Sequence, residues 1–302
     1  MQTVSRLITY NEHSQHNQPQ IKVRPGEVFF AETELCTGGW LNSIDDVWTP
    51  DKTCASNPTV CVAVEGAKPG DMLAVEILDI VPDKIGYTGF NSESNKLADK
   101  IISADWGLNV KTVRIDDEYV HWNEHVKLPV QPMIGTLGTA PKDIVLSNTY
   151  GGAHGGNMDV QEVCKGSTVY LPVAVENALL HIGDAHAIQG DGEINGSGGI
   201  ECRALVKLRL KLMKVPRSFK CVRIENESHI MTVACCSSLE ESFYLACEQL
   251  IQWMVDEYEF AIQEAYLFLG QVMKSRNTQF VNPTFSYICK VPKKFLVAYR
   301  HK

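Results

Sequence analysis

Alternating apolar and polar residues run through much of the first 235 positions of the chain. The clearest examples are residues 59–66, 71–81, 167–175 and 199–215. A period of two places successive side chains on opposite faces of a β-strand. In residues 199–215, Cys202, Val206 and Leu210 share one face, while Glu201 and Lys207 share the other. We therefore predict a long, half-buried antiparallel strand there, with Glu201 on its polar face.

Helical patterning is concentrated near the C-terminal end of the sequence. Ser238 with Glu241 three residues later is typical of a capping box, and apolar residues at helical spacing follow. A second helix is predicted over residues 258–274, and a short strand over 285–291. The sequence thus predicts a mainly β body over 1–235 that carries the functional loops. A helical pair and terminal strand over 236–302 are expected to pack on it as one integrated unit.

This order of elements defines the expected fold class. Strands followed by segregated helices favour a mostly β architecture, a sandwich with barrel-like elements, and a smaller α+β C-terminal part. Gly, Pro and Asp separate the predicted strands, as in GAKPGD at 66–71, and such residues favour hairpins over βαβ crossovers.

Composition and charge narrow the class of partner. The 302 residues are 44% hydrophobic and 21% charged, with a formal net charge of −8. Nucleic-acid-binding proteins gather Lys and Arg on one face, so we expect no nucleic-acid partner and favour a small neutral or cationic ligand. No apolar run approaches the roughly 20 residues of a spanning helix, and no signal-peptide core is visible. We expect a cytoplasmic protein with no membrane partner.

The ten cysteines carry little sign of disulfides. Most lie in apolar patterns such as CVAVE and TVACC, which indicates buried free thiols. No Cys-x-x-Cys pair occurs, so a structural cysteine-rich zinc site is not expected. Cys36 is the candidate nucleophile, but its acidic neighbours raise rather than lower a thiol pKa.

The stretch HIGDAHAIQGDGEINGSGGIE at 181–201 combines acids and glycines with no Lys or Arg. Asp184 and His186 share a face of an extended segment, and Asp191 and Glu193 form a second such pair. The parity changes between the pairs, which predicts a bend that folds one toward the other. Carboxylates with one imidazole suit zinc or another divalent metal. The competing interpretation is a surface turn satisfied by ordinary hydrogen bonds.

A second polar cluster lies upstream in NTYGGAHGGNMD at 148–159. His154, Asn157 and Asp159 stand there among four glycines, which allow the backbone to approach a ligand closely. Taken alone, this pattern is also that of a loop without a catalytic role. Glu32 and Glu34, on one face of a predicted strand, form a third acidic element. His121 and His125 in HWNEH are interpreted as surface or packing residues.

These motifs resemble the acetamidase/formamidase family. The resemblance rests on the 181–201 stretch and on HGGNMD at 154–159. It extends to segments at 57–80, 131–141 and 248–270. It implies a β-rich fold with a jelly-roll-like sandwich, hydrolysis of short linear amides to ammonia and carboxylate, a divalent metal and a homo-oligomer, dimeric or larger. Zinc is the expected metal and calcium the alternative.

Roles follow from the resemblance by position. It implies metal ligands at Asp159, Asp184, His186 and Glu34, substrate contacts at His154, Asn157 and Gln189, and proton transfer by Glu193 or Asp191. The chain departs from the family pattern at Glu34, at Val60–Val62 and over 273–282. These departures keep open a second hypothesis, a non-catalytic metal- or ligand-binding β-sandwich that retains the scaffold.

Overall fold

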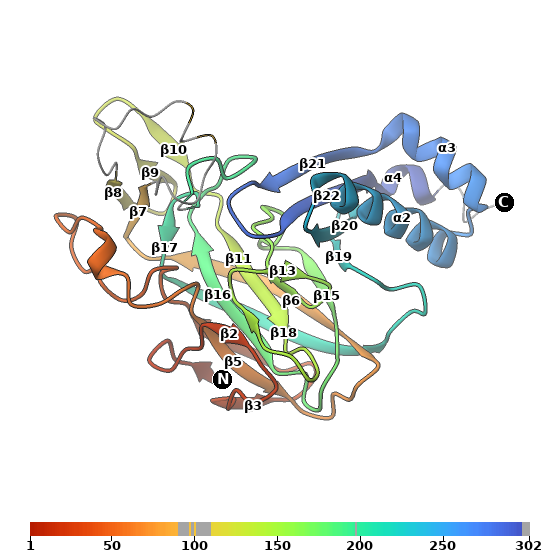
Figure 1. Cartoon of the computed structure of the whole chain (residues 1–302), viewed down its shortest axis with the longest axis horizontal. Helices are drawn as coiled ribbons and strands as arrows, with labels where there is room; N and C mark the ends of the chain where they lie inside the picture. The colour runs from red at the N-terminus through yellow and green to blue at the C-terminus, as the bar shows by residue number, and fades with distance from the viewer. Residues whose placement is uncertain (90–96, 98–99, 101–109, 197, 298–302) are drawn as a thin grey trace.

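Two large β-sheets and a C-terminal helical layer make up the protein in a computed structural model (Figure 1), which describes residues 1–89, 97, 100, 110–196 and 198–297. The first sheet has nine strands. In spatial order they are β1 (Thr3–Val4), β4 (Val28–Glu32), β18 (Ala204–Lys214), β6 (Asp71–Pro82), β15 (Thr168–Pro172), β19 (Val222–Glu225), β20 (His229–Cys236), β22 (Phe285–Pro292) and β21 (Lys274–Gln279).

The second sheet has eleven strands. Nine follow one path: β10 (Lys127–Pro129), β9 (Tyr119–His121), β8 (Val110–Ile115), β7 (Ile85–Gly89), β17 (Glu201–Cys202), β16 (Leu180–His186), β11 (Met133–Thr139), β14 (Gly155–Asn157) and β13 (Gly151–Gly152). Strand β5 (Thr59–Val64) joins β16 and β3 (Ile21–Val23). A separate pair contains β2 (Glu12–His13) and β12 (Leu146–Ser147). The expected mostly β class is confirmed, and the described strands form open sheets.

A single large core lies between the two sheets. Phe29, Leu73 and Leu208 from the nine-stranded sheet belong to one apolar cluster with Leu137 and Ile182 from the eleven-stranded sheet. Every residue of β11 and β16 is buried. Burial of apolar surface is worth about 25 cal/mol per Å², so this interface fixes how the two sheets stack. It also gives the residues at the end of β16 a rigid support.

The predicted strand over 199–215 is in fact two strands in different sheets. Glu201–Cys202 pairs with β16 and β7 in the eleven-stranded sheet, whereas Ala204–Lys214 pairs with β4 and β6 in the other. Arg203 lies at the crossing between them. The predicted polar-face position of Glu201 is therefore wrong, because the alternation does not carry across this break. Glu201 is buried, with only 2% of its surface exposed.

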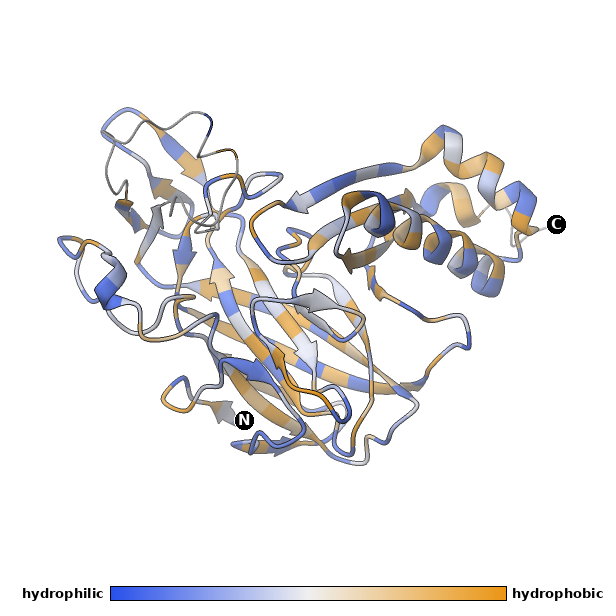
Figure 2. Ribbon diagram, in the orientation of Figure 1, coloured by the Kyte–Doolittle hydropathy of each residue, from blue (hydrophilic) through white to orange (hydrophobic). Residues whose placement is uncertain are grey.

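The C-terminal predictions are largely confirmed. Helix α2 (Leu239–Tyr258) begins at Ser238, whose hydroxyl accepts a hydrogen bond from the Glu241 backbone nitrogen at 3.1 Å. Helix α3 spans Ile262–Val272, shorter than predicted, because Glu259 adopts a left-handed conformation that ends α2. The predicted strand is β22, and a short helix α4 (Lys293–Leu296) and a 3₁₀ turn η1 (Pro50–Lys52) complete the elements. Figure 2 shows apolar and polar residues interspersed along α2 and α3.

Helix α2 packs on the end of the nine-stranded sheet. Trp253, Leu250 and Met254 form a second apolar cluster with Ile230 of β20 and Val291 of β22. Strand β20, at the end of the predicted β body, and strand β22, in the predicted C-terminal part, therefore pair in the same sheet, and α2 covers both.

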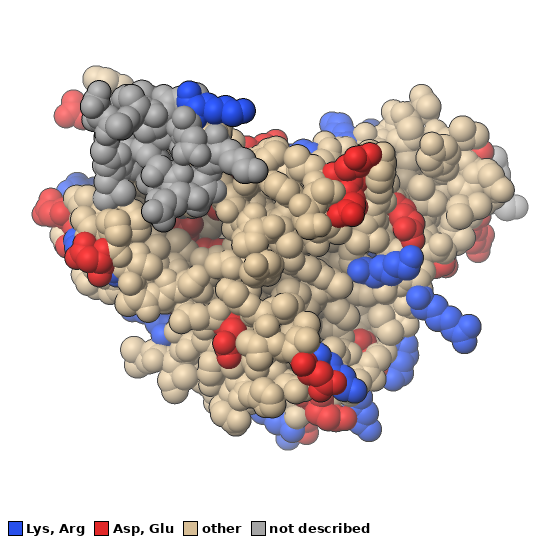
Figure 3. Space-filling model, in the orientation of Figure 1, with Lys and Arg blue, Asp and Glu red and all other residues tan. Residues whose placement is uncertain are grey.

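Thiol state and surface charge complete the description. All ten cysteines lie in the described residues and are free thiols, as predicted. On the face drawn in Figure 3, acidic and basic groups are interspersed. None of the described helices combines the length and apolar composition needed to cross a lipid bilayer.

Candidate active site

The candidate site lies where strand β16 ends. Asp184 and His186 belong to this strand, and Asp159 follows strand β14. One ligand atom from each of the three lies within 4.8 Å of the other two, and all three residues are buried. Asp184 and His186 therefore lie together as predicted, and the fold brings the third predicted ligand, Asp159, to them from the segment after β14, which lies beyond β11 in the sheet. Two carboxylates and one imidazole form a donor set suited to a divalent cation.

Gln189 fixes the orientation of the His186 ring. Its side-chain nitrogen donates to the backbone oxygens of Asp159 at 3.0 Å and Thr278 at 3.2 Å, so its oxygen is left to accept. His186 Nδ1 lies 2.8 Å from that oxygen, so Nδ1 carries a proton and donates it to Gln189. Nε2 then faces the carboxylates, and a metal ion bound there would replace its proton, as in a metal-ligating histidine oriented by a polar partner.

Gly135 forms the floor beneath the two aspartates. A Cβ atom at this position would lie 2.5 Å from Asp159 Oδ1 and 2.5 Å from Asp184 Oδ2. Strand β11, which carries Gly135, pairs directly with β16, so the carboxylates lie over its backbone. Only glycine leaves room for both oxygens. Asp184 and Asp159 themselves have φ values of 57° and 49°, a strained region for residues other than glycine.

Glu201 is a site residue that the sequence patterning misplaced. Its Oε1 lies 3.2 Å from His186 Nε2, and Asp184 Oδ1 lies 3.3 Å from the same nitrogen. Glu201 also forms a second candidate cation group with Cys36 and Asp184, so Asp184 is common to both groups. Its position in the sequence could have identified Glu201 as a site residue, because it is the last residue of the acidic, glycine-rich stretch that contains Asp184 and His186.

Burial shifts the pKa values of these groups. Burial and then the Asp184 carboxylate raise the pKa of Asp159 to about 6, and burial raises that of Glu201 to about 7. Burial lowers the pKa of His186, but the facing Glu201 and Asp184 carboxylates outweigh it and raise the pKa well above its usual value. Burial, followed by Glu201 and Asp184, also raises the pKa of Cys36, which disfavours a thiolate nucleophile as the sequence suggested.

Glu193 faces the same small cavity as Asp184 and Glu201. The cavity measures about 220 Å³ and is further lined by polar residues that include Ser56 and Asn57. Glu193 is buried, its Oε2 has no hydrogen-bond partner, and burial followed by the Asp159 charge raises its pKa well above the usual value. A carboxylic acid that stays protonated near neutral pH can act as a proton donor.

Three asparagine amides surround the acids. In the amide orientation that satisfies both ends, the Asn157 nitrogen lies 2.9 Å from Asp184 Oδ2, and its oxygen accepts from Asn57 Nδ2 at 2.7 Å. Asn282 Nδ2 donates to Asp159 Oδ2 at 2.6 Å. Asn157 was among the predicted residues. Sequence reasoning missed Asn57 and Asn282, whose partners lie far away along the chain.

Asp191 and Glu34 lie apart from the three-residue group. Asp191, whose side chain is 67% exposed, forms an ion pair with Arg276 at 2.7 Å. The Glu34 carboxylate pairs with Arg203 Nε and lies 3.5 Å from Arg6 Nε. The structure therefore separates Asp191 from Glu193, although the two were predicted to share a face. The loop bends between them and packs on the turn after β21, where Phe280 N donates to the Gly192 backbone oxygen at 2.9 Å (Figure 1).

His154 also lies outside the cavity, in a cluster of three buried histidines. Its ring centroid is 4.9 Å from that of His13, which in turn is 4.6 Å from that of His181. Burial lowers the pKa of His154 to about 4 and that of His181 to about 3. Burial and the two neighbouring rings likewise lower the pKa of His13. All three rings are therefore neutral at pH 7.

We expect this cluster to make stability fall as the pH drops below about 6.5. The unfolded histidines take up protons near their ordinary pKa, whereas the folded ones do not, so unfolding binds protons. For His154 the effect is on the order of 3 kcal/mol between pH 6.5 and 4. Urea unfolding at several pH values checks it. His154→Asn should flatten the dependence relative to the exposed control His16→Asn, and equal slopes for both variants would contradict the assignment.

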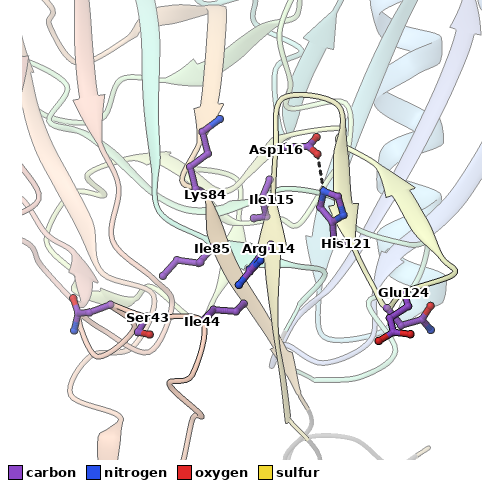
Figure 4. A pocket seen from close by; sticks show the side chains of 11 residues that line it. Ser43, Ile44, Lys84, Ile85, Arg114, Ile115, Asp116, His121 and Glu124 are labelled. Atoms are coloured by element: carbon purple, nitrogen blue, oxygen red, sulfur yellow. Dashed lines mark hydrogen bonds and ion pairs between the residues drawn. The ribbon is translucent and has the colours of Figure 1, made fainter.

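A larger cavity lies elsewhere and carries no comparable chemistry. It measures about 710 Å³ and lies between the loop at 42–44 and strands β7, β8 and β9 (Figure 4). His121 is there, and its Nε2 lies 2.6 Å from Asp116 Oδ2 near the protein surface. Since its titratable groups are solvent-exposed rather than buried together, we assign the function to the smaller cavity.

Comparison with characterised sequences identifies relatives. The Acetamidase/Formamidase family pattern matches residues 5–153 and 149–295. An acetamidase of Mycolicibacterium smegmatis is 30% identical over 254 residues, which cover 64% of this chain and 63% of that protein. A formamidase of Methylophilus methylotrophus is 29% identical and covers 64% and 61%, respectively. The chain thus spans about three fifths of the length of these relatives.

Solved structures agree over a larger share of the chain. The crystal structure of an acetamidase from Bacillus halodurans has a TM-score of 0.91 and 30% identity, and it covers 98% of this chain and 99% of its own. The family pattern covers nearly the whole sequence and includes every residue of the candidate site. The protein therefore belongs to the acetamidase/formamidase family.

Proposed function

We propose that the protein hydrolyses the C–N bond of short linear amides, such as formamide or acetamide, to ammonia and the carboxylate. The observation that carries the proposal is a small polar cavity lined by Asp184, Glu193 and Glu201, with Asp159 and His186 grouped around Asp184. A cavity of about 220 Å³ suits a substrate of few atoms. The names of its relatives support the same reaction class.

We further propose that a divalent metal, zinc in the first instance, binds to Asp159, Asp184 and His186. The donor set fits, because Asp159 Oδ1 is buried without a hydrogen-bond partner and His186 Nε2 lies 3.3 Å from Asp184 Oδ1, where a bound ion would replace the proton between them. When bound, such an ion supplies Lewis acidity, which polarises a carbonyl oxygen and acidifies water. Glu34 is left out of this ligand set, since Arg203 and Arg6 hold its carboxylate.

The chain's own residues supply the proton transfers. Amide hydrolysis requires a base for the attacking water and an acid for the departing nitrogen. Glu201, with a pKa raised to about 7 and a free Oε2, is the proposed acceptor of the water proton. Glu193, whose pKa burial and the Asp159 charge raise well above its usual value, is the proposed proton donor to the amide nitrogen, so that ammonia leaves. Asn57 and Asn282 line the cavity and orient the substrate.

Ammonia release from formamide, acetamide, propionamide and benzamide tests the proposed reaction. We expect turnover of the two smallest amides and a steep fall for the larger ones, because the cavity excludes them sterically. Release should be measured on protein loaded with zinc and, separately, with calcium. Absence of ammonia under every loading would favour a non-catalytic binding protein.

Removal of the metal is expected to abolish most of this activity. Dialysis against a chelator should lower kcat by at least about 100-fold, since the ion provides several kcal/mol of charge stabilisation. Zinc addition should restore turnover, and elemental analysis should find about one equivalent lost and regained. Turnover that is indifferent to chelation would overturn the metal assignment and leave the amidase assignment standing.

A further inference from the structure

Two thiols meet between helix α2 and strand β22, and neither of them lines the amide cavity. Cys247 of α2 and Cys289 of β22 have their Sγ atoms 3.5 Å apart. Met273 Sδ, at the end of α3, lies 3.8 Å from Cys247 Sγ. Cys289 is buried and Cys247 is partly exposed, so a small reagent can reach the first sulfur while the second stays protected.

The two sulfurs differ in acidity. The hydrogen bond with Cys289 lowers the pKa of Cys247, and the same hydrogen bond, together with burial, raises that of Cys289. Among the ten described cysteines, Cys247 is the one whose pKa is lowered. The thiolate is the reactive form of cysteine, so the more acidic and more accessible sulfur is the nucleophile, and its buried neighbour resolves the intermediate.

We propose that Cys247 and Cys289 form an oxidation site at which hydrogen peroxide converts the two thiols into a disulfide joining helix α2 to strand β22. The Cys247 sulfur attacks a peroxide oxygen, the O–O bond breaks, and the released hydroxide takes up a proton to leave as water. Cys289 then attacks the resulting sulfenic acid, transfers its proton to the departing hydroxyl, and a second water leaves. Two thiols lose two electrons, and one hydrogen peroxide becomes two waters.

The geometry requires little movement. A disulfide bond is about 2.05 Å long, so the sulfurs must approach each other by about 1.5 Å. The bond would join residues 42 positions apart and would restrict the unfolded chain. None of the residues assigned to amide hydrolysis belongs to the surrounding apolar cluster, so oxidation is expected to spare amide turnover.

Mass spectrometry of the folded, full-length protein tests the proposal. Reduced protein is treated with one equivalent of hydrogen peroxide, quenched with catalase, unfolded and alkylated with N-ethylmaleimide. We expect two fewer alkylated thiols, a cross-linked Cys247–Cys289 peptide and a higher Tm, all reversed by dithiothreitol. Cys289→Ser should abolish the cross-link and leave a Cys247 sulfenic acid that dimedone traps. The control variant is Cys61→Ser. Cys61 is a buried thiol in a different apolar cluster, so this change should leave the cross-link unchanged.

Two results would overturn the proposal. The first is full alkylation of Cys247 and Cys289 after peroxide treatment while the exposed Cys54 is oxidised. The second is a cross-link that appears when peroxide is added to the protein in denaturant but not when it is added to the folded protein, which would show that the bond forms only in unfolded molecules. Neither result bears on ammonia release, so the amidase proposal stands or falls separately.

Discussion

Replacing Glu193 with glutamine is expected to lower kcat/KM for formamide by about 10²–10⁴-fold, the usual contribution of a positioned proton donor. Glutamine keeps the size of the side chain but cannot deliver a proton to the amide nitrogen. The buried position and unpartnered Oε2 of Glu193 place the donor at the cavity. Ammonia release measures the loss, and circular dichroism and elemental analysis should show an unchanged fold and metal content.

Asp191→Asn provides the matched control for this variant. Asp191 lies on the same loop, two residues away, but its carboxylate is exposed and paired with Arg276. Loss of that surface ion pair costs about 0–1 kcal/mol of stability, and we expect kcat/KM to change less than about threefold. A Glu193→Gln protein with wild-type kcat/KM would remove Glu193 from proton transfer. Equal losses in both variants would point to the loop rather than to the proton.

The second large effect is expected from Gly135→Ala. The added methyl group would overlap Asp159 Oδ1 and Asp184 Oδ2, each 2.5 Å from its Cβ, so at least one carboxylate must move. Displacement of a site group by about 1 Å costs about 10²-fold in rate, and overpacking a buried position costs about 1–3 kcal/mol of stability. We therefore expect at least a 100-fold loss of kcat together with loss of bound metal.

Gly270→Ala is the matched control for the added methyl group. Gly270 lies in α3, and a Cβ there meets no atom within 4 Å. Alanine in a helix is favoured over glycine by about 0.5–1 kcal/mol, so this variant should unfold at slightly higher urea with unchanged kcat. Retention of metal and activity by Gly135→Ala, measured beside this control, would contradict the proposed carboxylate arrangement.

Local patterns in the sequence predicted the elements well. The alternation in residues 71–81 corresponds to β6, and the Ser238 capping box starts α2 at the predicted place. Both signals depend on neighbours within a few positions of the chain. Asp184 and His186 were placed together for the same reason, because two residues apart on a strand share a face.

The parts of the site that escaped prediction depend on distant contacts. Glu201 was assigned to a polar face because the alternation was extended across Arg203, where the chain leaves one sheet for the other. Asn282 contacts Asp159 from 123 positions away, and Gly135 is required only because two carboxylates from other strands lie over it. Such contacts have no local signature, since the partners are set by how distant segments pack and not by neighbouring residues in the sequence.

Strand β4 is synthesised long before β18, the strand that pairs with it in the sheet. Strand β4 pairs with β18, where Glu32 lies opposite Leu205. At about 5–20 residues per second, a ribosome adds the intervening stretch in roughly 9–35 s. Throughout that interval Phe29 and Ala31 lack the strand that covers them, so the nascent chain presents an unpaired apolar edge. The nascent chain is therefore expected to be most prone to aggregation before residues 204–214 have been synthesised.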